Sequence, residues 1–351
     1  MKLLERKESS AYRSNVIFIA YCCVLWASDP LQVITEALLD GYNAGMQSGD
    51  HLHSVFNQGL ALVSNFLTGQ SLSSVRQQFR DFFLSQVKKR SHMLRENALL
   101  YHLHIAMLQD GESRQYDECV DGLPGLGQIL KAKQDTTLSL LIKSCRVQWA
   151  FLFRRFDDIS FGENNLLDVL SEEKHQLRVS LVFAVFYEGL LSFQLARQTS
   201  NETQIKWIEK GVSVLANMQC WASHCAWNYE NKMLLLKAEN MYTVGQLDEA
   251  AELYTRSIRS AHDHKFIHEE AIASENAADF YFARHIFPKS VVLYKHSITC
   301  YKKWGALAVA KRVENMLQRK GLDIAQLDSI DDSLTFIFAS EQGSVKKRHA
   351  I

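Results

Sequence analysis

The sequence has little proline and no excess of charge of either sign. Only 3 of its 351 residues are proline. Proline interrupts helices because it lacks a backbone N–H and clashes with the preceding turn, so its scarcity favours long, uninterrupted helices. Lysine and arginine total 39, and so do aspartate and glutamate. Because no global field favours a polyanion, we expect no nucleic-acid partner.

Hydrophobic runs long enough to cross a bilayer are also missing. The apolar run at 16–26 is shorter than the ~20 residues that a membrane span needs. We interpret it as a buried helix rather than a signal peptide or anchor, with Asp29-Pro30 ending it and starting the next helix, and we expect no membrane insertion. The 7 cysteines are irregularly spaced, which is typical of reduced thiols in a cytoplasmic protein.

Apolar residues recur at steps of three and four through most of the chain, a spacing that predicts helices and not strands. Short turns at 48–50, 68–70, 244–246 and 285–288 should pack neighbouring helices antiparallel, as hairpins. The expected helices are about 10–27, 31–47, 51–68, 72–90, 93–109, 123–133, 136–153, 164–172, 176–197, 202–219, 229–243, 247–263, 266–284, 287–303 and 305–318.

Two hairpins near the C-terminus repeat each other at an offset of 40 residues. Small residues at matched positions would let facing helices approach closely, and the tyrosines would fill the space between hairpins. Gly245 falls at a helix end, where a left-handed backbone is favoured. His285 occupies the matched position, so we expect Pro288 to make the second turn instead. The matched pairs are Ala238 and Ala278, Gly245 and His285, Ala250 and Ser290, Tyr254 and Tyr294, and Ser257 and Ser297.

The segment 247–254, Leu-Asp-Glu-Ala-Ala-Glu-Leu-Tyr, resembles the tetratricopeptide repeat. Segments 231–239, 270–281 and 301–308, together with 38–50 and 147–157, resemble the helical region of multi-sensor signalling kinases. In that family a kinase-like domain and a STAND-type (AAA-related) ATPase domain precede the helical array, and a GAF sensor with a histidine kinase or other output domain follows. The resemblance extends over about residues 15–318 and is carried by packing motifs.

We therefore predict an all-α protein, an α-solenoid of stacked antiparallel helical hairpins of tetratricopeptide-like type. A divergent helical-repeat array is expected over 1–227, tetratricopeptide-like hairpins over 228–320 and a flexible tail over 321–351. The residues predicted to pack the repeats are Ala238, Gly245, Ala250, Tyr254, Ala278, Ser290, Tyr294 and Trp304.

Sequence motifs for phosphate chemistry are absent. The sequence has no Gly-x-x-x-x-Gly-Lys-Ser/Thr loop, kinase glycine-rich loop, His-Arg-Asp loop or histidine-kinase nucleotide box. We predict a non-catalytic scaffold in signal transduction, without catalytic residues, cofactor or metal. Its expected partners are protein domains or peptides, with ATPase, GAF and kinase domains among the candidates. The alternative is a fragment or separately encoded coupling segment of an ATPase/histidine-kinase enzyme.

Several clusters invite a chemical interpretation. Cys220, His224 and Cys225 lie at helical spacing but have no fourth ligand at a familiar distance along the chain, so packing is favoured over a metal site. His102 and His104 should point in different directions on a helix.

Three further segments are ambiguous. The glycine-rich stretch 122–127 is expected to be a loop rather than a phosphate cradle. The histidines of 262–268 should cap a helix end rather than take part in catalysis. A stripe of aromatic residues is expected in the core, with peptide binding as the alternative; its members are Phe183, Phe186, Tyr187 and Phe193.

Overall fold

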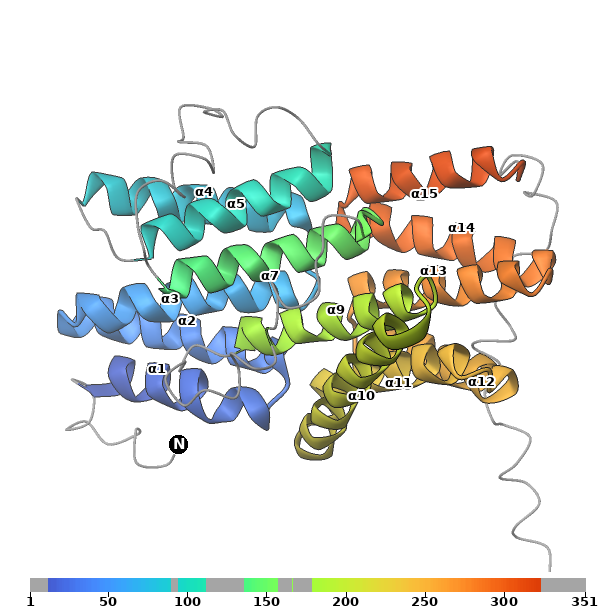
Figure 1. Ribbon diagram of the computed structural model, residues 1–351. Helices are drawn as coiled ribbons and strands as arrows, with labels where there is room; N and C mark the ends of the chain where they lie inside the picture. The colour runs from blue at the N-terminus through green and yellow to red at the C-terminus, as the bar shows by residue number, and fades with distance from the viewer. Residues whose placement is uncertain (1–11, 90–93, 112–135, 157–165, 167–178, 323–351) are drawn as a thin grey trace, which may run out of the picture.

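The computed structural model describes residues 12–89, 94–111, 136–156, 166 and 179–322 (Figure 1). These residues form thirteen α-helices and one short 3-10 helix. The expected helix at 123–133 lies outside the described residues, as does that at 164–172 except for Leu166, and so does the expected tail from residue 323 onward. The helices are α1 (Arg13–Cys23), η3 (Leu25–Ala27), α2 (Leu31–Ser48), α3 (His51–Leu67), α4 (Leu72–Lys88), α5 (Arg95–Asp110), α7 (Thr136–Leu152), α9 (Val179–Ala196), α10 (Asn201–His224), α11 (Ala226–Thr243), α12 (Leu247–Asp263), α13 (Ile267–Ala283), α14 (Phe287–Trp304) and α15 (Leu307–Arg319).

Most helices pack against their neighbours in sequence as antiparallel pairs. The pairs α2/α3, α4/α5, α9/α10, α11/α12 and α13/α14 are the main hairpins. The prediction of an all-α protein of antiparallel hairpins is thus confirmed. Within the described residues, no helix combines the length and the apolar character that a membrane span needs.

The turns of the C-terminal hairpins recur every 20 residues. Gly245, Lys265, His285 and Gly305 all have a positive φ, of 81°, 64°, 59° and 97°. At each turn the next residue's amide donates to a carbonyl five residues back, as Gln246 does to Met241, which is the Schellman ending of a helix. The 40-residue repeat is therefore two helices of one 20-residue spacing.

The expectation for the turn at 285 was wrong. His285 itself adopts the left-handed conformation, with φ 59°, and Ile286 makes the Schellman bond to Tyr281. Pro288 lies in the first turn of α14, where its missing N–H leaves no helical bond unmade. The backbone pattern at this turn overrides the residue preference for glycine.

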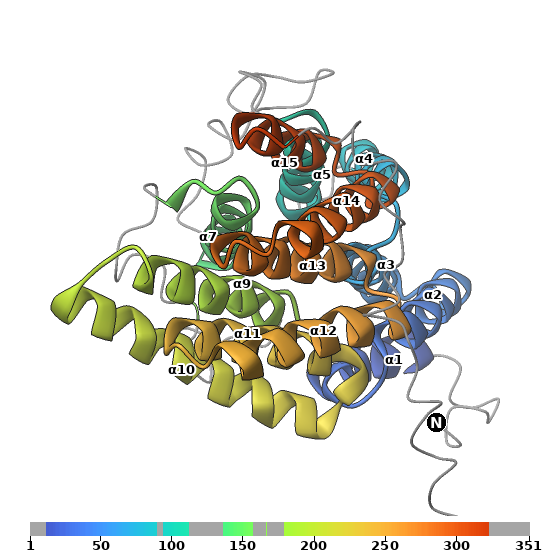
Figure 2. The ribbon, with the colours of Figure 1, turned by 90° about the vertical axis from the view of Figure 1, so that its right-hand side faces the viewer.

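Helices far apart in sequence also lie side by side. Helix α5 packs against α15, α3 against α9, and α11 against both α9 and α13. In Figure 2, α13 lies in the middle of the molecule, between α14 above it and α12 below. One hydrophobic core contains residues from the first helices to the last, including Leu38, Phe79, Phe186, Tyr254 and Trp304.

One side chain joins the start of α2 to the start of α11. Asn228 Oδ1 accepts from the Leu31 amide at 3.0 Å, and Asn228 Nδ2 donates to the Asp29 carbonyl at 2.8 Å. The residue before α2 is Pro30, which has no capping side chain. Asn228 therefore supplies from a distant segment the hydrogen bond that a local N-cap residue usually makes.

The left-handed turns generate a prediction on stability. Gly245→Ala should lower the free energy of unfolding by about 1 kcal/mol, because an L-residue is strained at positive φ; a Cβ there meets no atom within 4 Å, so no steric clash contributes. Lys265→Gly, at an exposed turn, should raise it by up to about 1 kcal/mol as that strain is relieved. Urea titrations of both variants test this; a Gly245→Ala protein more stable than wild type would contradict it.

Candidate functional site

The residues predicted to pack the repeats lie mostly in the interior. Gly245 lies at an exposed turn, whereas the other seven are buried. Ala238 is on α11 and faces the hairpin partner that carries Ala250 and Tyr254 on α12. The buried residues are Ala238, Ala250, Tyr254, Ala278, Ser290, Tyr294 and Trp304.

The 40-residue repeat includes a polar contact that sequence comparison missed. Tyr254 Oη donates to Glu239 Oε1 at 2.7 Å, and Tyr294 Oη donates to Asp279 Oδ1. Each carboxylate lies 15 residues before its tyrosine, and each also accepts from an arginine outside its hairpin: Arg197 for Glu239, and Arg154 for Asp279. Both acids have equivalent places on α11 and α13, so the signal was an acidic residue repeated at the same offset.

Helix α13 carries buried carboxylates that are paired with distant cations. Glu275 is 2% exposed and accepts from Arg154 Nη2 at 2.8 Å, Arg312 Nη2 at 2.7 Å and Tyr301 Oη at 2.9 Å. Burial alone would raise the pKa of Glu275, but the two guanidinium groups outweigh it and lower that pKa from 4.5 to about 2. The carboxylate is therefore ionised and fully engaged within the fold.

A second buried pair lies one and a half turns earlier on α13. Lys232 Nζ donates to Glu269 Oε2 at 2.7 Å and to the Asn228 carbonyl at 2.6 Å. The ammonium group also lies 4.3 Å from the ring centroid of Phe183 and 4.4 Å from that of Phe266. Burial lowers the pKa of Lys232, yet the amine is inaccessible to a substrate from solution.

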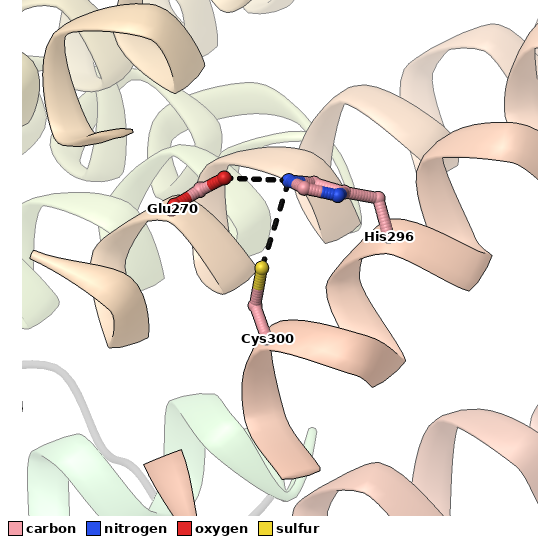
Figure 3. Close-up of side chains that lie close together, drawn as sticks. All are labelled: Glu270, His296 and Cys300. Atoms are coloured by element: carbon pink, nitrogen blue, oxygen red, sulfur yellow. Dashed lines mark hydrogen bonds and ion pairs between the residues drawn. The ribbon is translucent and has the colours of Figure 1, made fainter. Parts of the chain in front are cut away.

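The third acidic side chain, Glu270, joins a small cluster near the surface (Figure 3). His296 Nε2 lies 2.7 Å from Glu270 Oε1 and 3.6 Å from Cys300 Sγ, so both contacts use the same ring nitrogen. His262 Nδ1 lies 3.2 Å from the same Glu270 oxygen. His296 and Cys300 are one helical turn apart on α14, a spacing that could have drawn attention in the sequence.

A cavity lies between α3, α5, α7, α9 and α13. Its volume is about 30 Å³, and its lining includes Phe66, Tyr101, Gln148, Tyr187 and His268. That volume holds a few water molecules at most, whereas small-molecule sites are typically about 300–1,000 Å³. The cavity is too small for a metabolite.

The cysteine–histidine candidate of the sequence is only partly assembled. Cys220 Sγ and His224 Nε2 are 4.0 Å apart on exposed turns of α10. Cys225 is buried and forms the N-cap of α11. The three residues do not converge on one point with a further ligand among the described residues.

The other histidine and aromatic candidates contact separate partners. His102 Nδ1 lies 3.2 Å from the Arg76 carbonyl, whereas His104 Nε2 lies 2.8 Å from Gln148 Oε1, so the two rings face different helices. Burial lowers the pKa of His104 to about 4. The stretch 122–127 lies outside the described residues. The aromatic stripe on α9 is buried, as its packing interpretation required: Phe183, Phe186, Tyr187 and Phe193.

The histidines at the end of α12 also have separate surroundings. The His264 ring packs on Trp227, with centroids 4.6 Å apart, and His268 lies beside Trp304 at 5.1 Å. Only His262 of this group approaches the Glu270 cluster. A shared site for all of them is therefore not formed.

These contacts define an all-α protein of sequential, mostly antiparallel helices, with its buried charges used inside the fold. Comparisons with protein-family models, curated proteins and solved structures found no match to the chain.

The Glu275 pairing generates a prediction with a pH dependence. Glu275→Gln should lower the free energy of unfolding by about 3–5 kcal/mol at pH 7, because it removes the charge partner of two buried arginines. The pKa of Glu275 is below its unfolded value of 4.5, so its contribution is full above pH 4.5 and is lost as the pH falls toward 2. The difference between wild type and variant should therefore shrink at pH 3.

Denaturant titrations at pH 7 and pH 3 measure both effects. Glu249→Gln is the control, because Glu249 pairs with Lys237 at an exposed site and should contribute less than about 1 kcal/mol. Equal losses in the two variants at pH 7 would refute the assignment.

Proposed function

We propose that the chain is a non-catalytic α-solenoid scaffold of tetratricopeptide-like hairpins that binds protein partners in signal transduction. The observation that carries the repeat assignment is the recurrence of one turn every 20 residues, combined with a tyrosine–carboxylate bond repeated at 40 residues. Repeated hairpins build extended surfaces suited to protein segments. The five cysteines described by their side chains are free thiols, which supports a cytoplasmic setting.

The use of charged groups supports a non-catalytic role. Glu239, Glu269 and Glu275 are each buried and paired with a cation of the same chain. Carboxylates held in this way stabilise the fold, whereas a catalytic acid or base must reach a substrate.

An exposed apolar stripe on α1 is the proposed contact surface. Tyr12, Val16 and Ile19 are 69%, 43% and 51% exposed and follow one another at steps of four and three. The opposite side of α1, with Ile17 and Tyr21, is buried where α1 packs on α2 and α3. An apolar stripe at this spacing is the means by which helices bind to one another or to a groove.

The resemblance to multi-sensor kinases suggests the partner class, namely STAND-type ATPase, GAF or kinase domains. The same resemblance supports the alternative that the chain is a coupling segment of such an enzyme. Coding sequence for a phosphate-loop ATPase or a GAF domain, in frame beside residues 1–351, would decide in favour of the alternative.

The scaffold proposal predicts that a photo-crosslinking residue at position 19 captures a defined partner. Ile19→Glu should then weaken binding of that partner at least tenfold, about 1.4 kcal/mol, because a charge enters the apolar contact. Val212→Glu is the matched control, since Val212 is an exposed apolar residue on α10. Circular dichroism should show the same helical melt for all three proteins.

Two outcomes would contradict the proposal. One is partner binding that is unaffected by Ile19→Glu but lost in Val212→Glu. The other is hydrolysis of ATP or phosphoryl transfer by the purified chain.

A further inference from the structure

Three consecutive helices bring metal-ligating side chains to one point. Glu270 is in the first turns of α13, His296 and Cys300 are on α14, and His262 is in the last turn of α12. The carboxylate oxygen, imidazole nitrogen and sulfur of Glu270, His296 and Cys300 all lie within 4.8 Å of one another (Figure 3). Contacts between consecutive helices fix these positions, since α13 packs on both α12 and α14.

The arrangement around His296 does not suit a nucleophile relay. A cysteine–histidine–carboxylate relay places the thiol on one ring nitrogen and the carboxylate on the other. Here Glu270 Oε1 and Cys300 Sγ both contact Nε2. A single nitrogen with one hydrogen or one lone pair cannot serve both neighbours fully, whereas a shared cation can bind all three atoms at once.

We propose that Glu270, His296 and Cys300 bind a zinc ion, with His262 as the fourth ligand. Carboxylate, imidazole and thiolate are the protein ligands of zinc, and a four-ligand set is typical of structural zinc sites. This proposal replaces our expectation of no metal site, which considered only ligands close together in sequence.

The distances require only local adjustment. With ligand bonds of about 2.0–2.3 Å, tetrahedral zinc ligands lie roughly 3.3–3.6 Å apart. His296 Nε2 and Cys300 Sγ are already 3.6 Å apart. Glu270 and His296 are at hydrogen-bond distance, 2.7 Å, so the carboxylate must rotate outward when the ion enters.

Burial of the ligands grades from the interior to the surface. Cys300 is 3% exposed, the His296 side chain 15% and the His262 side chain 56%. The exposed imidazole of His262 gives an ion a route inward and can swing to complete the ligand set. On binding, the Cys300 thiol loses its proton to solvent and the sulfur forms the zinc bond in its place.

A zinc ion at this point would join α12, α13 and α14. Because an ion that binds only the folded state stabilises it by mass action, zinc should raise the melting temperature. The proposed role is a clip that fixes one tetratricopeptide-like hairpin against the next.

The test uses the full chain without an affinity tag, titrated with Co²⁺ and Zn²⁺ after treatment with a chelator. We expect one ion per chain, a thiolate-to-cobalt charge-transfer absorption, displacement of Co²⁺ by Zn²⁺ and a higher melting temperature. Cys300→Ser should abolish the charge-transfer band and weaken zinc binding at least tenfold, and Glu270→Gln should weaken it as well. Cys220→Ser is the matched control, since Cys220 and His224 form an exposed pair of the same residue types one turn apart.

Each outcome bears on the proposal. No bound metal in the wild-type chain would overturn it, and so would a charge-transfer band that persists in Cys300→Ser or disappears in Cys220→Ser. Because Cys300→Ser changes one atom, its circular dichroism in chelator should match that of wild type. If that variant fails to fold, the loss of the band in Glu270→Gln and His296→Gln decides the question.

Discussion

A carboxylate that is removed from water needs a cation beside it, and this requirement determines the centre of the molecule. Helix α13 buries Glu269 and Glu275. Their partners are Lys232 of α11 for the first, and Arg154 and Arg312 for the second. An uncompensated buried charge costs about 3–5 kcal/mol. The end of α7, α11 and α15 are thus held at fixed positions around α13.

Arg154 is the most economical link in this arrangement. It follows α7 in a left-handed turn with φ 58° and donates to Glu275, Asn276 and Asp279 on α13. More than 120 residues of chain separate the arginine from these partners. Together with Asn228 at the start of α2, it ties the N-terminal helices to the hairpins of 228–320.

Local features of the fold were predictable because they depend on neighbouring residues. Turns with glycine placed helix ends to within a residue or two, as in α2, expected at 31–47 and observed over Leu31–Ser48. The boundary between α10 and α11 was harder. We expected helices over 202–219 and 229–243, but α10 continues to His224 and α11 begins at Ala226. No glycine or proline marks this turn, and Asn228 bonds there to the distant Asp29 and Leu31.

Charge pairs and the zinc cluster were not predictable, because their members come from separate helices. The repeat at 40 residues identified Tyr254 and Tyr294, but not the carboxylates that they contact. His296 and Cys300 are a recognisable pair in sequence, whereas Glu270 joins them only when α13 packs against α14. The packing motifs therefore indicate the scaffold, and the polar contacts specify how it is assembled.

The central claim is that the buried charges of α13 make the N-terminal helices and the C-terminal hairpins one cooperative unit. Native-state hydrogen exchange in increasing denaturant measures this directly. The account predicts that core amides of α3, α9 and α13 exchange through one unfolding event, with the same limiting free energy. Exchange of α11–α15 as a separate unit, at a free energy different from that of α2–α9, would contradict it.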